Sequence, residues 1–459
     1  MMYNKIAKHI LLPLYYYKSK NNSLQRLSHL EKSQYFSTEV IMKAQLDKLK
    51  KLLQHCYDNV PFYRERFDSV GFNPAKFCNV NDLNCIPYLT KDDLQNNLHQ
   101  LVARNYKKEH LILDASGGST GKPTNFYKDV RRFLDSRADQ IRHDRWCGWD
   151  LGEKCVKLWG AQREFDVQFS RKYQLVEKYV FRIFGFNAFD VSEEKVLQHI
   201  ETLKIIKPTM ILAYTNVAYL FAEIIKSKGI DLSHLRLKGL ICSAETLTEQ
   251  KRTAIESAFC CKVLNRYGSR EVGLVASECL EQRGLHINMD SAYVEIEKGG
   301  KATLPGEPGE IIVTDLWNYG MPFIRYQMGD VGTKSSQPCK CGRNLPTIKN
   351  IEGRVSDFLI DSKGGLVHGE YFTHLFYGLE GVEQFQLVQE TIDKIRLRIL
   401  PGKNFIPSVL DPVVVKIRQC LGDSVNVDIE VCESSFVEAS GKFRFTISKV
   451  SNGYFKDGV

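Results

Sequence analysis

The 459-residue sequence contains no apolar run long enough to cross a bilayer. The run at residues 10–17, Ile-Leu-Leu-Pro-Leu-Tyr-Tyr-Tyr, is short, contains a proline and lacks a small-residue cleavage site, so it makes a poor signal peptide. The weakly charged stretch at residues 211–222 is also too short. Internal repeats, low-complexity tracts and nucleic-acid-binding motifs are absent as well. These absences argue against an integral membrane protein, a repeat protein and a dedicated nucleic-acid binder.

Cysteine is not scarce. The chain has 13 cysteines, an odd number, and without a secretion signal this favours reduced thiols and a cytoplasmic location. Composition is ordinary for a globular protein, with 43% apolar and 25% charged residues, and the length predicts more than one domain.

The net charge of +9 is concentrated near the start of the chain, where residues 1–60 hold ten Lys and Arg against four Asp and Glu. A basic arm of this kind can contact anionic lipid or nucleic acid. We interpret it as a solvated face, with at most peripheral membrane contact and no nucleic-acid partner.

Residues 114–125, Asp-Ala-Ser-Gly-Gly-Ser-Thr-Gly-Lys-Pro-Thr-Asn, are the most informative segment. They follow the apolar residues 110–113, which predict a short strand. A loop this rich in Gly, Ser and Thr brings N–H groups, hydroxyls and one ammonium close to a polyphosphate. It is not the P-loop of ordinary nucleotidases, because only three residues separate Gly117 from Gly121 and a proline follows Lys122. The segment predicts a phosphate loop of another kind, with a plain glycine-rich turn as the alternative.

The hydrophobic pattern predicts helices over the first hundred residues. One of them, over residues 40–57, has an apolar stripe with helical spacing. The stripe consists of Met42, Leu46, Leu49, Leu53 and Cys56, with Leu52 beside it.

From about residue 110 to 350, short apolar runs alternate with helical patterns. Strands are expected over 154–159, 208–213 and 238–242, and helices over 193–206, 216–228 and 248–259. Alternation of this kind predicts an α/β fold with a mainly parallel sheet covered by helices. Ligand groups in such sheets gather at the carboxyl ends of the strands, where the loops of Gly117, Ser243 and Tyr267 fall.

After residue 353 the pattern changes to that of a small α+β domain of about a hundred residues. Strands are expected over 383–388, 394–400, 425–431 and 442–448, and a helix over 407–421.

Five ordered segments, spread over more than 300 residues, resemble the motifs of the acyl-adenylate-forming enzymes, which include acyl-CoA synthetases, luciferases and peptide synthetase adenylation domains. These are the phosphate loop, Tyr267-Gly268-Ser269-Arg270-Glu271, Tyr326-Gln327-Met328-Gly329-Asp330, Gly353-Arg354-Val355-Ser356-Asp357 and Ser440-Gly441-Lys442. Residues 59–64 and 86–94 are similar to the phenylacetate–CoA ligase branch, including its capsule-biosynthesis relatives. The resemblance covers the chain from about Leu46 onward.

The resemblance implies a large ATP- and acyl-binding domain over residues 1–354, with a helical leader to about residue 109. A small mobile domain over 355–459 then carries the catalytic lysine, and Asp357 is the hinge. The implied activity is that of an ATP-dependent carboxylic-acid ligase. The acid attacks the α-phosphate of ATP, pyrophosphate leaves, and the acyl group passes from the acyl-AMP to an acceptor.

The resemblance also assigns residues to the nucleotide. The phosphates fall to Ser116, Gly117, Gly118, Ser119, Thr120, Gly121 and Lys122, and the edge of the adenine to Ser243, Ala244 and Glu245. Adenine stacks on Tyr267, where the missing side chain of Gly268 lets a flat ligand lie against the ring. Asp330 accepts hydrogen bonds from the ribose hydroxyls and Arg354 reaches the ribose or phosphate. The alternatives are a core aromatic for Tyr267 and a salt-bridge partner for Arg354.

Three charged residues are expected to act on the reacting phosphate. Glu271 holds Mg²⁺, since a hard cation prefers carboxylate and phosphate oxygen, unless it is a surface carboxylate that caps a following helix. Lys122 contacts the outer phosphates, and Lys442 lies between the attacking carboxylate and the α-phosphate. Trp159 and Tyr214, each at a strand end, border the acid or simply pack.

Coenzyme A is the acceptor that the resemblance favours. An amine or hydroxyl in capsular or surface polysaccharide biosynthesis is the first alternative. A non-catalytic nucleotide-binding member is the second, although intact Glu271, Asp330 and Lys442 argue against a retired site.

One group falls outside nucleotide chemistry. Cys339 and Cys341 form a tight Cys-x-Cys turn, and Cys279 and His286 bracket a polar segment some fifty residues upstream. Three thiolates and one imidazole complete a tetrahedral structural zinc site, and part of the phenylacetate–CoA ligase branch looks similar here. The alternative is a set of free turn cysteines.

Overall fold

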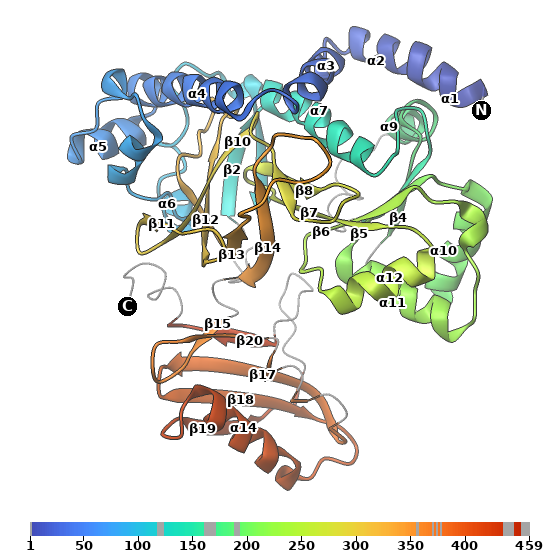
Figure 1. The fold of residues 1–459 in the computed structure, drawn as a ribbon, viewed down its shortest axis with the longest axis vertical. Helices are drawn as coiled ribbons and strands as arrows, with labels where there is room; N and C mark the ends of the chain where they lie inside the picture. Colours follow the sequence, from blue (N-terminus) through green and yellow to red (C-terminus); the bar gives the residue numbers. More distant parts are fainter. Residues whose placement is uncertain are drawn as a thin grey trace.

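The computed structural model describes residues 2–116, 124–159, 171–187, 193–354, 358–369, 371–372, 375–376, 379–434 and 445–450. Along the chain, the structure consists of a helical leader, a large sheet with covering helices, and a small sheet with one long helix (Figure 1). Among the described residues, none of the helices combines the length and hydrophobicity that crossing a bilayer requires.

The leader is helical, as predicted, and its first four α-helices run along one edge of the large sheet (Figure 1). The elements are α1 (Met2–Ile6), η1 (Ala7–Leu11), α2 (Leu12–Lys18), α3 (Ser23–Ser33), α4 (Thr38–Asn59), α5 (Pro61–Ser69), η2 (Pro74–Lys76), η3 (Val80–Cys85), α6 (Lys91–Asn96) and η4 (Lys108–His110). Helix α4 begins where the Ser37 hydroxyl accepts a hydrogen bond from the backbone N–H of Val40.

The predicted apolar stripe of α4 agrees with the structure in its second half and is wrong at Met42, which is 53% exposed. Ile41 and Gln45 are buried in its place. The Gln45 amide donates hydrogen bonds to the carbonyl oxygens of Met289 and Ala292, at 3.1 and 2.9 Å. A satisfied amide is stable in a core, and a pattern of apolar residues cannot identify such a position.

In the part of the chain that the structure describes, the large sheet has twelve strands in the order β11-β10-β12-β13-β14-β9-β8-β7-β6-β5-β3-β4. Five are parallel: β3 (Cys155–Trp159), β4 (Ile183–Asn187), β5 (Met210–Tyr214), β6 (Gly239–Ser243) and β7 (Val263–Ser269). Antiparallel pairing joins the rest: β8 (Gly273–Glu278), β9 (Leu285–Ile287), β10 (Ala292–Lys298), β11 (Lys301–Ala302), β12 (Pro308–Asp315), β13 (Tyr326–Lys334) and β14 (Thr347–Arg354).

The predicted α/β class is confirmed, and the sheet is mixed. The parallel arrangement holds from β3 to β7, where helices alternate with strands, because a parallel connection needs a crossover. Strand β8 follows β7 after a short turn and pairs antiparallel, so the expectation of a mainly parallel sheet fails from there on. The helices of this region are α7 (Val130–Trp146), α9 (Arg171–Val176), η5 (Glu177–Phe181), α10 (Glu193–Ile206), α11 (Thr215–Ser227), η6 (Ser233–Leu235) and α12 (Glu249–Phe259).

The small sheet has the described order β19-β18-β17-β20 and lies apart from the large sheet (Figure 1). Its region contains β15 (Phe358–Ile360), β16 (Leu366–His368), β17 (Val382–Thr391), β18 (Lys394–Pro401), η8 (Pro407–Leu410), α14 (Asp411–Leu421), β19 (Asn426–Val431) and β20 (Thr446–Ser448). The strands predicted over 383–388, 394–400 and 425–431 and the helix over 407–421 are confirmed, and β20 covers the last three residues of the strand predicted over 442–448, whose first three lie outside the described residues. A separate apolar cluster drawn from residues 359–427 fills its core.

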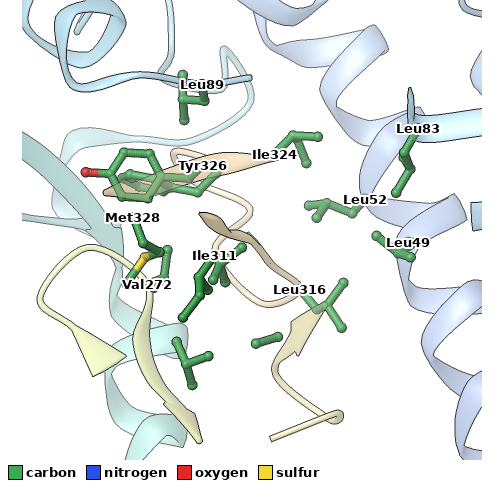
Figure 2. Close-up of a cluster of buried hydrophobic side chains, with 14 of the residues drawn as sticks. Leu49, Leu52, Leu83, Leu89, Val272, Ile311, Leu316, Ile324, Tyr326 and Met328 are labelled. Atoms are coloured by element: carbon green, nitrogen blue, oxygen red, sulfur yellow. The ribbon is translucent and has the colours of Figure 1, made fainter. Parts of the chain in front are cut away.

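The leader and the sheet share one core, which holds strand β13 in place. Leu49 and Leu52 of α4 belong to the same buried cluster as Ile324 and Tyr326 (Figure 2). Burial of a leucine side chain stabilises the fold by about 1.5–3 kcal/mol, so this contact is substantial. The backbone of Leu89 donates to Arg325 O and accepts from Gln327 N, both at 2.9 Å. Segment 86–94 therefore fixes the start of β13.

Candidate functional site

The predicted phosphate loop is the connection of a β-hairpin. Strand β1 (Leu111–Ser116) pairs antiparallel with β2 (Thr124–Asp129), and Ser116 lies opposite Thr124. The Ser116 hydroxyl oxygen is buried and has no hydrogen-bond partner among the described residues. A buried hydroxyl without a partner costs free energy, so this oxygen is an available hydrogen-bonding group next to the predicted loop.

Eight predicted site residues lie outside the described residues. They are Gly117, Gly118, Ser119, Thr120, Gly121, Lys122, Asp357 and Lys442.

The carboxyl ends of neighbouring parallel strands meet at one edge of the sheet, as expected. Tyr214 at the end of β5 is paired with Ser243 at the end of β6, and Ser243 with Arg266 of β7. Tyr267 follows directly. The Ser243 hydroxyl donates to the carbonyl oxygen of Arg266 at 3.0 Å. The arrangement places the loops after β5, β6 and β7 side by side.

Tyr267 and Asp330 are brought together from strands that are far apart in the sequence. The Tyr267 hydroxyl donates to Asp330 Oδ2 at 2.8 Å. Burial, and next the negative charge of Asp330, raise the pKa of Tyr267 well above its usual value, so the hydroxyl keeps its proton. Arg354 of β14 is the register partner of Asp330. Three of the predicted nucleotide residues thus form one group.

Glu271 is buried, with 6% of its surface exposed, and precedes strand β8 rather than a helix. The alternative of a surface carboxylate that caps a helix is therefore wrong. The Tyr326 hydroxyl lies 3.4 Å from Glu271 Oε1. Burial, followed by the charge of Glu271, raises the pKa of Tyr326. Tyr326 begins the Tyr326–Asp330 motif, which assigns it no role of its own, and no spacing rule connects it with Glu271.

Two register shifts lie close to these side chains in the sequence. The register shifts between Tyr267 and Gly268, and a Cβ added to Gly268 would lie 2.2 Å from the carbonyl oxygen of Gly273. Gly268 is therefore required by the close approach of its own hairpin. This reason stands beside the expected one, space for a flat ligand, which stays a prediction. A second shift in the β12–β13 pairing spans Gly329, whose φ of +73° belongs to the left-handed region.

The predicted adenine-edge segment has structural roles as well. Glu245 accepts a hydrogen bond from the backbone N–H of Asn216 at 2.7 Å, so its carboxylate lies at the first turn of α11. Thr215 Oγ1 donates to the Glu245 carbonyl oxygen at 3.0 Å. Ala244 has a φ of +71°, which costs a non-glycine residue about 1 kcal/mol or more. These contacts hold the loop after β6 against the next helix.

Trp159 and Tyr214, expected to border the acid or to pack, stack on each other. Their ring centroids are 4.2 Å apart, with 26° between the planes. Both lie at the carboxyl ends of their strands, β3 and β5, on the same edge as Ser243. The stacked pair lies on β3 and β5, and β6 separates it from Tyr267 on β7.

The four Cys and His residues, which are distant in the sequence, converge. Their ligand atoms all lie within 4.8 Å of one another. The Sγ atoms of Cys279 and Cys339 are 3.7 Å apart, and Cys341 Sγ lies 3.3 Å from His286 Nε2. A tetrahedral zinc ion with Zn–S bonds of about 2.3 Å separates two sulfurs by about 3.8 Å. The donors therefore have the spacing of one tetrahedral ion.

The surroundings of His286 suit a neutral ligand. Its Nδ1 lies 3.3 Å from the carbonyl oxygen of Leu345, so Nδ1 carries the proton and Nε2 faces the thiols. Burial, opposed by that hydrogen bond and assisted by Arg343, lowers the pKa of His286 to about 4. The cluster joins the β8–β9 hairpin to the loop before β14.

Comparison with known proteins confirms the resemblance drawn from the motifs. The chain is 26% identical to the phenylacetate-coenzyme A ligase of Thermus thermophilus over 392 residues, covering 81% of this chain and 84% of that one. It is 27% identical to protein CapK of Staphylococcus aureus over 419 residues, covering 89% and 90%. The family model described as the CapK C-terminal domain matches residues 359–449.

The fold is that of adenylate-forming ligases. The chain superposes on the crystal structure of 2-hydroxyisobutyryl-CoA ligase in the postadenylation state, in complex with 2-HIB-AMP, with a TM-score of 0.69 at 19% identity. The match covers 90% of this chain and 91% of that one. The small sheet and its position after β14 are therefore part of a shared architecture.

Proposed function

We propose that the protein is an ATP-dependent carboxylic-acid ligase that forms an acyl-AMP and transfers the acyl group to coenzyme A. A carboxylate oxygen bonds to the α-phosphorus of ATP, and the bond to the bridging oxygen breaks to release pyrophosphate. A thiol sulfur then attacks the acyl carbon, AMP leaves, and the thiol loses its proton. The observation that carries the proposal is the convergence of Tyr267, Asp330 and Arg354 near the buried Glu271, on the fold of adenylate-forming ligases.

Each residue has a proposed role. Tyr267 supports the adenine, while Asp330 and Arg354 bind the ribose, with Ser243, Ala244 and Glu245 at the adenine edge. Ser116 and the residues through Lys122 bind the phosphates. A phosphate oxygen would give the Ser116 hydroxyl the hydrogen-bond partner that it lacks among the described residues. Glu271 suits Mg²⁺. Its carboxylate is buried, and its 3.4 Å contact with the Tyr326 hydroxyl is long, so its oxygens can bind a hard cation. When bound, Mg²⁺ neutralises charge on the phosphate oxygens.

We also propose that residues 1–354 and 355–459 are separate domains with Asp357 as the hinge. Strand β14 ends the large sheet at Arg354, and β15 begins at Phe358. The β15 backbone is tied to the small sheet, because Gln389 of β17 exchanges two hydrogen bonds with Ile360, at 2.9 and 2.7 Å. Among the residues that the structure describes, the large sheet contributes none to the small core. Motion about the hinge would let one site run both half-reactions.

The proposed location is the cytoplasm. All thirteen cysteines are free in the structure, and none of the pairs forms a disulfide. Thiols in this state fit a reducing compartment that also supplies ATP.

Exchange of labelled pyrophosphate into ATP tests the activity directly. The exchange should depend on a carboxylic acid, because only reversible acyl-adenylate formation carries labelled pyrophosphate into ATP. An Asp330→Asn variant should bind the nucleotide more weakly and show a lower rate of exchange. A broad acid panel that gives no acid-dependent exchange would contradict the proposal and favour a non-catalytic nucleotide-binding protein.

The acceptor has a second candidate. The matching CapK C-terminal domain and the CapK relative favour an amine or hydroxyl of a capsular or surface polysaccharide precursor. Once the acid is known, release of AMP with coenzyme A, amino sugars or hydroxyl acceptors separates the two. Rapid AMP release with coenzyme A alone supports the ligase, whereas release only with a sugar acceptor supports the alternative.

We propose that Cys279, His286, Cys339 and Cys341 hold a structural Zn²⁺. The four ligand atoms lie within 4.8 Å of one another, and two of the sulfurs are 3.7 Å apart. Together with the hydrogen bond between His286 and Leu345, these distances fit a closed Cys₃His site. The cluster is buried at three of its four positions, which leaves little room for a substrate.

Purified protein is expected to contain about one equivalent of zinc, because closed sites of this kind retain their metal. A Cys339→Ser, Cys341→Ser variant should lose the zinc and unfold at a lower temperature. The matched control is Cys78→Ser, Cys260→Ser, two exposed cysteines outside the cluster, which should keep both the metal and the melting temperature. Elemental analysis and thermal unfolding measure the two results. Absence of zinc from the purified wild-type protein would contradict the proposed zinc site.

A further inference from the structure

The leader exposes an unusual number of apolar side chains. Of the 23 large apolar residues that are exposed within the described chain, nine fall between residues 2 and 42. They are Met2, Tyr3, Ile10, Leu14, Tyr17, Tyr35, Phe36, Val40 and Met42. Single exposed apolar residues are ordinary, but a concentration of this kind in one short segment marks an interaction surface.

The first helical segment has two apolar stripes. Leu12 and Tyr16 are buried against the body of the protein. Ile10, Leu14 and Tyr17, with the helical spacing i, i+4 and i+7, are 52%, 51% and 84% exposed. The second stripe therefore faces away from the core, and we call it the outer stripe.

The segment is docked firmly by its inner side. Lys8 forms an ion pair with Asp150, and Tyr3 donates a hydrogen bond to the carbonyl oxygen of Tyr179 at 2.9 Å. The backbone of Asn4 approaches Gly152 so closely that a Cβ there would lie 2.3 Å from the Asn4 carbonyl oxygen. The outer stripe is thus presented on a fixed helix, at the edge where α1 to α4 lie (Figure 1).

Positive charge accompanies the outer stripe. Lys5, Lys18 and Lys20 are exposed, and no ion pair involves them within the described residues. They belong to the first 60 residues, which carry ten basic and four acidic side chains. Exposed lysines next to apolar side chains are the pattern of a helix that lies in a lipid interface.

We propose that the outer stripe and its lysines bind a membrane surface that contains anionic lipid. Ile10, Leu14 and Tyr17 enter the boundary between headgroups and acyl chains, while the lysines contact lipid phosphates. A second copy of the chain fits less well, because a symmetric contact would bring the same unpaired lysines together, and lysine is depleted from protein interfaces. The proposal does not depend on the proposed catalytic function.

Vesicle co-sedimentation tests the proposal. The full chain should pellet with phosphatidylcholine vesicles that contain phosphatidylglycerol and stay in solution with pure phosphatidylcholine. Binding should fall as salt is raised, since the screening length shrinks from about 10 Å at 0.1 M to about 3 Å at 1 M.

An Ile10→Ser, Leu14→Ser, Tyr17→Ser variant should bind anionic vesicles more weakly by roughly tenfold or more, because partial burial of three such side chains is lost. The matched control is Ile205→Ser, Leu304→Ser, Ile406→Ser, three exposed apolar residues that lie elsewhere on the chain. A Lys5→Gln, Lys18→Gln, Lys20→Gln variant should lose about fivefold for each lysine. Its control is Lys301→Gln, Lys403→Gln, Lys416→Gln, three exposed lysines outside the leader.

Circular dichroism verifies that each variant is folded, and the lysine variant tests the surface without removing any apolar contact. Wild-type protein that stays in solution with anionic vesicles at low salt would overturn the proposal. Equal binding by the stripe variant and its control would do the same. A dimer in sedimentation velocity that the stripe variant abolishes would assign the outer stripe to a second copy instead.

Discussion

A Lys442→Ala variant is expected to form the acyl adenylate roughly 10²–10³ times more slowly than the wild-type protein. Charge builds up on the α-phosphate oxygens during attack, and one preorganised cation at that point stabilises the transition state more than the ground state. Coenzyme A attack on preformed acyl-AMP does not need this cation and should change by less than about threefold. Pyrophosphate exchange and single-turnover thioester formation measure the two half-reactions separately.

The matched control is Lys449→Ala. Lys449 follows strand β20 and forms an ion pair with Glu390 at the surface, so it shares the charge and the region but contacts no proposed substrate. An exposed pair of this kind contributes little to stability, about 0–1 kcal/mol. Its loss should leave both half-reactions unchanged. An equal loss in both lysine variants, or no loss in either, would show that Lys442 has no special position.

An Arg325→Met variant is expected to destabilise the fold by about 3–5 kcal/mol, because the change removes the cation that pairs with two buried carboxylates. Arg325 is 2% exposed and lies 3.2 Å from Glu295 and 2.8 Å from Glu297. It also donates to the carbonyl oxygens of Leu83 and Ile86, at 3.0 and 2.8 Å. Arg325 joins the leader to the start of β13, which carries the Tyr326–Asp330 motif. Denaturant unfolding followed by tryptophan fluorescence measures the loss.

The effect should depend on pH with a definite sign. Burial raises the pKa of Glu295 from its usual 4.5 to about 7, against the opposing charge of Arg325. Between these two values the folded protein binds more protons than the unfolded chain, so this group lowers stability as pH rises through the window. Without Arg325 the folded pKa rises further and the window extends to higher pH. The variant should therefore lose more stability at pH 8 than at pH 5.5.

Arg396→Met is the matched control for this prediction. Arg396 lies on β18 and pairs with Glu390 and Glu430 at 3.4 and 3.5 Å, but its side chain is 45% exposed. Water screens those pairs, and the change should cost less than about 1 kcal/mol at either pH. If Arg325→Met is as mild as this control, or loses more at low pH, the buried cluster does not hold the leader to β13.

The sequence predicted the parts of the candidate site in which a particular residue type is needed for a particular chemical role. The Tyr267 and Asp330 motifs contact each other, and the four Cys and His residues converge although some fifty residues separate the pairs. Cysteine, histidine and the motif residues are distinctive side chains that recur in fixed spacings, so the sequence identifies them as candidates. The contact of Tyr326 with Glu271 was not predictable, because it depends on how β13 and the end of β7 approach across the sheet.

The backbone features of the site were also beyond the sequence. Both motif regions contain a register shift: β8 has one extra residue opposite Tyr267 and Gly268, and β13 has two extra residues around Gly329 opposite β12. The roles of Glu245 at the start of α11 and of Trp159 against Tyr214 arise from which strand ends are neighbours. Sequence spacing alone does not fix that order.

By itself, the sequence determined the alternating helices and strands between residues 193 and 259, most elements of the small sheet region, the α/β class, the change of pattern near residue 353, and the side chains available for nucleotide and metal chemistry. Those properties depend on periodicity and on residue type, which are local. The tertiary structure decided which strands run antiparallel, which residues pair across the sheet, and why Gln45 and Arg325 are buried while Met42 is exposed. Those outcomes depend on partners from distant segments, whose hydrogen bonds and charges offset the cost of burial only after the chain has folded.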